Sequence, residues 1–177
     1  MNIELSFSSP RELKGYIGSQ VRRCVAVGHY FSLFDLDESE RTAGFTHYIL
    51  QIAEMAEAIR LAQLALAQLI EIDGQTVHQF LKSDERPYSW DERVDDKSVD
   101  WLKNTFMGKM HFCWGQARYF LEWFDVMDDG DYNETYARAL TELASIQEAI
   151  LLVQLAYTHI LRIDNQDRYR QIKNLLR

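Results

Sequence analysis

Proline and glycine are scarce in this sequence, which has only 2 Pro and 8 Gly among its 177 residues. Both residues disfavour the interior of a helix, whereas the abundant Leu, Ala, Glu, Gln and Arg favour it. The composition therefore predicts an all-α protein. The length fits a single domain, residues 1–177, which is large enough to bury a substantial core.

Cysteine is also rare, and the motifs of several common sites are missing. The 2 Cys do not form a Cys-x-x-Cys pair, which argues against a disulfide-rich secreted domain and a zinc site. No Gly-rich phosphate loop and no Gly-x-Ser-x-Gly turn occurs. A di-iron carboxylate site needs Glu-x-x-His, and neither Glu57 nor Glu148 has a histidine at that spacing. We therefore expect neither a metal ion nor a cofactor.

The sequence has fewer basic than acidic residues, and it has no long hydrophobic run. The formal net charge of −8 argues against a protein whose main task is to bind a nucleic-acid backbone. The N-terminal residues show neither the basic segment nor the apolar core of a signal peptide. Uninterrupted apolar stretches such as Ala149–Val153 are far too short to span a bilayer. These features predict a cytoplasmic protein without membrane contact.

The sequence repeats itself once, and the repeat covers most of the chain. Residues 51–75 align without a gap with residues 142–166, and eleven of these 25 positions are identical. Further identities link residues 9–31 with residues 98–120. We interpret residues 9–82 and 98–173 as two copies of one unit, joined by a charged connector at 83–97. Because there are only two copies, we expect two halves packed about a pseudo-two-fold axis rather than a solenoid.

Each copy has the pattern of a helical hairpin. Ser9, Pro10 and Glu12 form a helix start signal, and Ser98 is the corresponding cap in the second copy. Longer helices are expected over residues 38–72 and 133–163, followed by short helices near 76–82 and 167–176. The predicted fold is an antiparallel four-helix bundle built from two tandem helical hairpins with short accessory helices.

Two cysteines occupy equivalent positions on the apolar sides of the first helix of each copy. These are Cys24 and Cys113. A buried cysteine commonly behaves as a small hydrophobic residue, and no basic cluster on that side would lower the pKa of either thiol. We expect both side chains to lie in the core.

The segment RRCVAVGHY carries Arg22 and His29, seven residues apart and therefore on one side of the first helix. This spacing resembles the catalytic motif of the HEPN ribonucleases, which are all-helical and often dimeric. The resemblance implies metal-independent RNA cleavage by Arg and His side chains of paired helices. At the corresponding positions of the second copy stand His111 and Arg118, in reversed order. A solvated helix face, or structural ion pairs, would place the same residue types there.

Acidic loops and aromatic residues outside the apolar faces favour protein binding. The loops at residues 35–40, 84–96 and 125–134 are rich in Asp and Glu. Trp114 also points away from the apolar side of its helix. Such surfaces suit recognition of another protein, and their charge would steer a basic partner. The candidate partner-binding residues are Asp35, Asp37, Glu38, Tyr88, Trp90, Asp128, Asp129 and Asp131.

Two functions from different classes follow. We expect first a non-enzymatic, acidic interaction module: an adaptor, inhibitor or immunity-type protein that binds another protein. The alternative is a HEPN-like, metal-independent ribonuclease that uses Arg22/His29 and His111/Arg118, which requires these four side chains to converge in one cleft with a basic rim. Broad apolar helices also allow the chain to form a homodimer.

Overall fold

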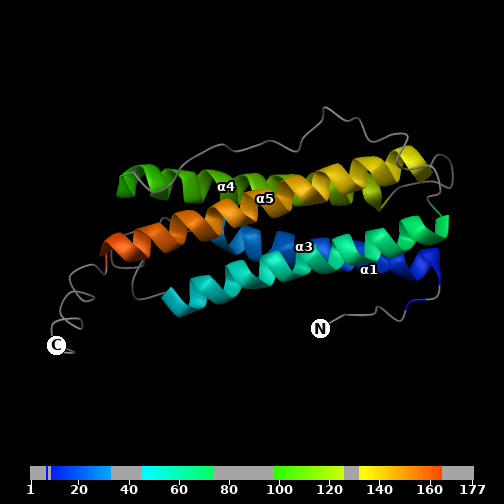
Figure 1. The fold of residues 1–177 in the computed structure, drawn as a ribbon, viewed down its shortest axis with the longest axis horizontal. Coiled ribbons are helices and arrows are strands. Elements are labelled where there is room, and N and C mark those ends of the chain that lie inside the picture. Colours follow the sequence, from blue (N-terminus) through cyan, green and yellow to red (C-terminus); the bar gives the residue numbers. More distant parts are fainter. Residues whose placement is uncertain (1–6, 8, 33–44, 74–97, 126–131, 165–177) are drawn as a thin grey trace.

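The computed structural model describes residues 7, 9–32, 45–73, 98–125 and 132–164. In this part of the chain the protein is all-helical, with four helices and no strands. The helices lie lengthwise beside one another as a bundle (Figure 1). They are α1 (Pro10–Ser32), α3 (Phe45–Asp73), α4 (Val99–Phe124) and α5 (Tyr132–Asp164). The predicted all-α class is confirmed.

Side-chain caps start two of the helices as the sequence predicts. The Ser9 hydroxyl accepts a hydrogen bond from the Glu12 backbone N–H at 3.3 Å, and the Ser98 hydroxyl accepts one from the Trp101 N–H at 3.2 Å. Each cap satisfies a backbone donor that the helix itself cannot, which stabilises the protein by about 1 kcal/mol. Helix α5 has the bounds expected from the sequence to within one residue.

Other predicted segments lie outside the described residues. Helix α3 is described from Phe45 onward, so the expected start at Glu38 falls outside. The same holds for the predicted short helices near 76–82 and 167–176.

The four helices pack mainly in neighbouring pairs. Helix α1 packs against α3 and α4, and helix α5 also packs against α3 and α4. Helices α1 and α5 therefore stand at opposite corners of the bundle, as do α3 and α4. This arrangement gives the surface four faces, each formed by two adjacent helices.

One aromatic side chain from each helix contributes to a layer of the core. Phe31 of α1 contacts Tyr48 of α3 and Phe106 of α4, with ring centroids 5.6 and 6.0 Å apart. Tyr157 of α5 closes the layer, with its ring centroid 5.9 Å from Tyr48 and 5.6 Å from Phe106. All four residues are buried, and such tilted or edge-to-face pairs add to the stabilisation from burial. The contacts within this layer connect all four helices.

The two cysteines lie in the core, as predicted. Both are fully buried, and burial raises the pKa of the Cys24 thiol to about 12. Burial also raises the pKa of Cys113, and the neighbouring Cys24 raises it further. The Cys113 thiol lies 3.9 Å from the Ile146 carbonyl oxygen, which accepts its weak hydrogen bond. Both side chains are therefore neutral packing groups.

Burial of Cys24 should make the protein less stable at alkaline pH. An unfolded chain exposes this thiol, which then loses its proton above a pH of about 8.5, whereas the folded chain keeps the proton up to about pH 12. The folded state thus binds more protons in this window, so the free energy of unfolding falls as the pH rises. Between pH 8 and 10.5 a Cys24→Ala variant should lose roughly 2 kcal/mol less stability than the wild type.

Urea unfolding of both proteins at the two pH values measures this difference. The constant cost of removing the sulfur cancels, because each protein is compared with itself. An identical loss of stability in the two proteins would show that the Cys24 thiol is accessible to water in the folded state.

One helix within the described residues meets the length and composition criteria for crossing a membrane. It covers Asn133–Ile163, and 44% of its most apolar stretch of 18 residues is buried in the bundle. No long uninterrupted apolar run marks this helix in the sequence, because polar residues such as Glu148 divide its apolar stretches. The core helix of a soluble bundle has the same properties, so this is weak evidence for a membrane and is compatible with a soluble protein.

Candidate functional site

The face between α1 and α4 holds an ion pair between the two halves of the chain. Arg22 of α1 donates a hydrogen bond from Nη2 to Oδ2 of Asp125, directly after α4, at 2.6 Å. Gly18 makes room for the pair, since a Cβ at this position would stand 3.1 Å from Asp125 Oδ1. Both charged side chains are about half exposed, at 56% and 41%, so the pair contributes at most about 1 kcal/mol.

Trp114 occupies the middle of the same face. The His29 ring of α1 lies against the Trp114 indole, with centroids 5.6 Å apart and ring planes inclined by 34°. Arg118, one turn further along α4, places its guanidinium carbon 6.0 Å from the indole centroid. The helices approach closely here because residue 28 is Gly; a Cβ there would lie 3.2 Å from the Trp114 Cβ.

The structure thus places two of the four residues of the ribonuclease hypothesis near one side chain, Trp114. His29 and Arg118 both contact Trp114, whereas Arg22 is bonded to Asp125. His111 precedes Trp114 by three residues and so lies one turn away on the same side of α4. Arg118 has a carboxylate neighbour, Glu122, at 3.6 Å. Both arginines are therefore compensated by acids, which does not match a basic rim.

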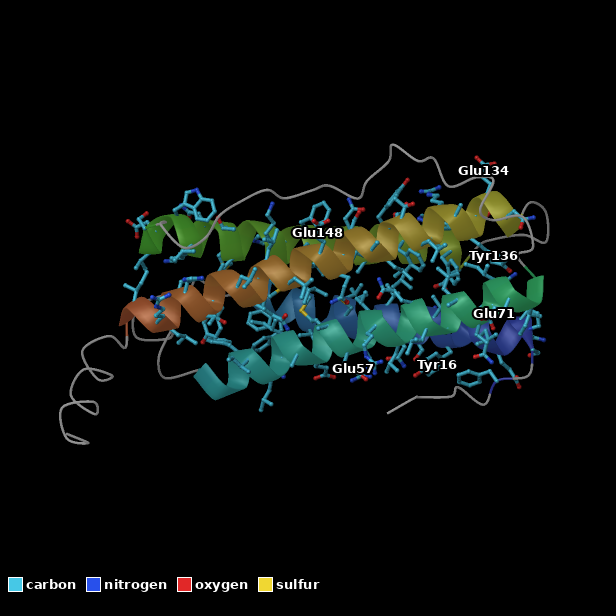
Figure 2. The ribbon with its side chains drawn as sticks, in the orientation of Figure 1. Tyr16, Glu57, Glu71, Glu134, Tyr136 and Glu148 are labelled. Atoms are coloured by element: carbon cyan, nitrogen blue, oxygen red, sulfur yellow. The ribbon has the colours of Figure 1, made fainter. Side chains whose placement is uncertain are left out.

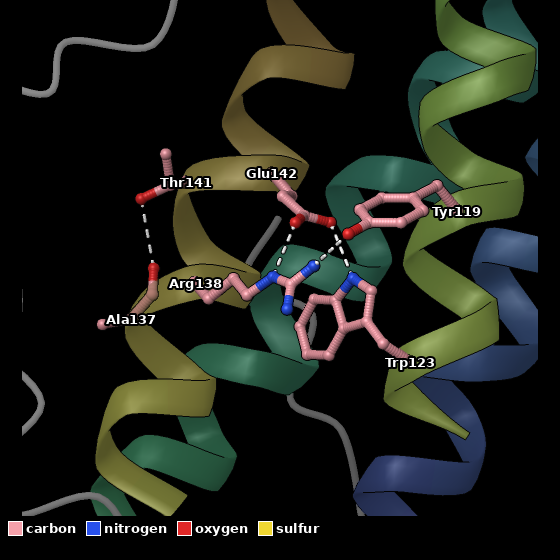
Figure 3. A network of polar contacts seen from close by, with 6 residues as sticks. All are labelled: Tyr119, Trp123, Ala137, Arg138, Thr141 and Glu142. Carbon is pink, nitrogen blue, oxygen red and sulfur yellow. Dashed lines mark hydrogen bonds and ion pairs between the residues drawn. The ribbon is translucent and has the colours of Figure 1, made fainter. Parts of the chain in front are cut away.

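A second polar cluster spans the face between α4 and α5, and we call it the α4–α5 cluster (Figure 3). It consists of Tyr119, Trp123, Arg138 and Glu142. Arg138 donates from Nε to Glu142 Oε1 at 2.9 Å and from Nη2 to the Tyr119 hydroxyl at 2.9 Å. The Trp123 indole N–H donates to the other oxygen of Glu142 at 3.0 Å. One carboxylate thus holds both an arginine and a tryptophan in place.

The Arg138 guanidinium also stacks on the two aromatic rings of this cluster. Its carbon lies 4.2 Å from the Trp123 ring centroid and 5.4 Å from that of Tyr119, within the range of cation–π attraction. Burial acts to lower the pKa of Arg138, but the hydrogen bonds and charge of Glu142 and Tyr119 outweigh this and raise the pKa. The group is therefore a fixed cation at every physiological pH.

The α4–α5 cluster is not among the sites predicted from the sequence. Its signal is two pairs at a spacing of four residues, Tyr119 with Trp123 and Arg138 with Glu142. The alignment of the sequence with itself provides a second signal. The corresponding residues of the first copy are Tyr30, Phe34, His47 and Gln51. The arginine, the carboxylate and the tryptophan occur together in the second copy only.

The predicted partner-binding residues lie outside the described part of the chain. This applies to all eight: Asp35, Asp37, Glu38, Tyr88, Trp90, Asp128, Asp129 and Asp131.

Within the described residues, no group of three His, Cys, Asp or Glu side chains is arranged to hold a metal ion. Figure 2 shows Glu57 beside α3 and Glu148 beside α5, so these equivalent carboxylates belong to different helices. Glu57 accepts two hydrogen bonds from Arg60, at 2.8 and 2.7 Å, which lower the pKa of the carboxyl group. The Glu57 carboxylate is thus engaged in an ion pair with Arg60 of the same helix.

No protein-family model matches this chain, and no curated protein and no solved structure is detectably similar to it.

Proposed function

We propose that this protein acts by binding another protein, and that the α4–α5 cluster is the centre of the binding surface. The observation that carries the proposal is the half-exposed side chain of Arg138, which is stacked on Trp123 and hydrogen-bonded to Tyr119 and Glu142. Capture of a protein partner by the wild-type chain, and its loss when this cluster is disrupted, tests the proposal.

The composition of the cluster supports a binding role. Trp, Tyr and Arg are the residue types that contribute most to the binding energy of protein interfaces. Tyr119 is 49% exposed, and the side chain of Arg138 is 44% exposed, so both can reach a partner. Because hydrogen bonds and stacking already fix their positions, binding costs less conformational entropy than it would with mobile side chains. The surface is thus preorganised for a partner.

The acidic segment between α4 and α5 extends the proposed surface. Residues 126–131 follow Asp125 at the end of α4 and contain the candidate contacts Asp128, Asp129 and Asp131. We propose that the acidic residues at 35–40 and 84–96 add negative charge that steers a basic partner toward the chain. An adaptor, an inhibitor or an immunity-type protein would work in this way.

We also propose that the bundle is an antiparallel arrangement of two tandem hairpins. Support comes from burial, which matches at most of the identical positions of the two copies. The pairs Cys24/Cys113 and Ile59/Ile150 are buried in both copies, and the pair Leu64/Leu155 is exposed in both. Figure 1 adds that the start of α1 and the end of α3 lie at one end of the bundle, together with the end of α4 and the start of α5. Under this proposal, residues 9–82 and 98–173 are the two hairpins of one domain.

The ribonuclease remains a second candidate because His29 of α1 and Arg118 of α4 both lie near the Trp114 ring. The binding proposal predicts that the purified chain leaves single-stranded RNA intact in buffer containing EDTA, at a rate indistinguishable from the buffer alone. The physical reason is that an acidic side chain lies beside each arginine of the site, so a phosphate would meet negative charge.

Gel analysis of a labelled RNA measures the rate of cleavage, and two histidine variants identify the residue responsible for any cleavage. Cleavage by the wild type that disappears in His29→Ala and persists in His159→Ala would overturn the binding proposal in favour of the enzyme. His159 is a suitable control, since it is a partly buried histidine on α5, away from Trp114.

A further inference from the structure

The face between α3 and α5 combines exposed leucines with a pocket, and the proposed function does not use it. Leu151 and Leu155 of α5 are 49% and 48% exposed, and Ile49 of α3 is 40% exposed. Exposed aliphatic side chains that gather on one face usually mark a binding surface. We call this region, together with the pocket beside it, the α3–α5 patch.

The pocket has a volume of about 200 Å³ and an apolar lining. Its floor is formed by Ile52 and Tyr157, which are buried, and its rim carries Gln154 and Thr158. Sites for small molecules usually measure about 300–1,000 Å³. A pocket of this size is better suited to a single hydrophobic side chain of a protein partner.

The pocket and the exposed leucines lie next to each other. Leu151 and Leu155 are one helical turn apart, and Thr158 follows Leu155 by three residues, so they form one strip along α5. One copy of the chain therefore presents both a projecting side chain and a pocket that can receive one. A dimer with two-fold symmetry needs this property, because the same surface serves on both subunits.

Charge favours a second copy over a basic partner at this face. The chain carries a net charge of −8, so two copies repel each other wherever acidic surfaces meet. The pocket is lined by uncharged residues only. On the outer side of α3, Glu57 and Arg60 neutralise each other in an ion pair of 2.7 Å. The α3–α5 patch thus allows close approach of an identical chain.

The dimensions of the face are sufficient for a stable dimer. Helices α3 and α5 have 29 and 33 residues, which correspond to lengths of about 45–50 Å. Two adjacent helices, each about 10 Å wide, offer a face of roughly 800 Å² or more, which is the area per partner of a standard interface.

We propose that two copies of this chain form a homodimer through the α3–α5 patch, with Leu155 of each copy filling the pocket lined by Ile49, Ala53 and Thr158 of the other. The interface does not involve the α4–α5 cluster. The dimer would therefore present two binding surfaces for the partner of the proposed function.

Sedimentation equilibrium of the full chain tests the dimer directly. The wild type should be dimeric, and Leu155→Glu should raise the dissociation constant of the dimer at least about 100-fold, because the substitution occurs twice in a symmetric interface. Tyr30→Glu is the matched control, because Tyr30 is 39% exposed and belongs to α1, the helix at the opposite corner of the bundle from α5. This control should stay dimeric.

A second variant keeps the proposal testable if Leu155→Glu fails to fold. Ala53→Phe fills the pocket from its own chain and should also give a monomer with an unchanged circular dichroism spectrum. A monomeric wild type, or a dimer that survives both substitutions, would overturn the proposal. If a monomeric wild type instead floats with phosphatidylcholine–phosphatidylglycerol vesicles and Leu155→Glu does not, the patch serves a membrane surface and the homodimer is wrong.

Discussion

Replacing Phe106 with alanine should lower the free energy of unfolding by about 3–5 kcal/mol. Phe106 is fully buried, and its ring contacts Phe31 of α1 and Tyr157 of α5. Truncation removes both contacts and leaves a cavity where the four helices meet. A domain of this size is stable by about 5–15 kcal/mol, so the variant loses a large share of its stability.

Urea unfolding followed by circular dichroism measures this loss. Leu50→Ala serves as the control, because Leu50 is 61% exposed and its truncation should change stability by less than about 0.5 kcal/mol. Equal effects of the two substitutions would mean that the aromatic layer of Phe31, Tyr48, Phe106 and Tyr157 does not hold the helices together.

Replacing Arg138 with alanine should weaken binding of the protein partner by roughly 30-fold, which corresponds to about 2 kcal/mol. The substitution removes the cation stacked on Trp123 and leaves Tyr119 without its fixed donor. Glu142 keeps the bond from the Trp123 indole, so the fold should be retained. Titration of the immobilised chain with the purified partner measures the change in dissociation constant.

Arg23→Ala is the matched control for this prediction. The Arg23 side chain is 44% exposed, as is that of Arg138, and it also bonds to a carboxylate, Glu54, at 3.1 Å. It lies between α1 and α3, away from the α4–α5 cluster. Partner binding should be unchanged in this variant. A similar loss in both variants would indicate a general charge effect in place of a specific surface.

Much of the fold could be predicted from local sequence patterns. The helical spacing of apolar residues places Cys24, Phe31 and Cys113 on buried faces, and the structure has all three in the core. The caps at Ser9 and Ser98 follow from residue type and position alone. These predictions succeed because a cap depends on residues within one helical turn, and the buried face of a helix depends on the spacing of its apolar residues. Both can be read from the sequence alone.

The contacts between helices could not be predicted in the same way. The meeting of His29 with Trp114, and the aromatic layer around Phe106, depend on how far each helix is shifted along its neighbour. Side-chain periodicity gives the buried face of a helix but not this shift, which packing of the whole bundle determines. The α4–α5 cluster was missed for this reason, because Trp123 and Glu142 belong to different helices.

Parallel affinity capture with three tagged chains tests the central claim most directly. The wild type, Arg23→Ala and Arg138→Ala are exposed to the same lysate of the source organism, and the retained proteins are identified by mass spectrometry. We predict one protein in stoichiometric amount on the wild type and on Arg23→Ala, and its loss from Arg138→Ala. The same proteins on all three chains, or none on any of them, would contradict a binding function centred on the α4–α5 cluster.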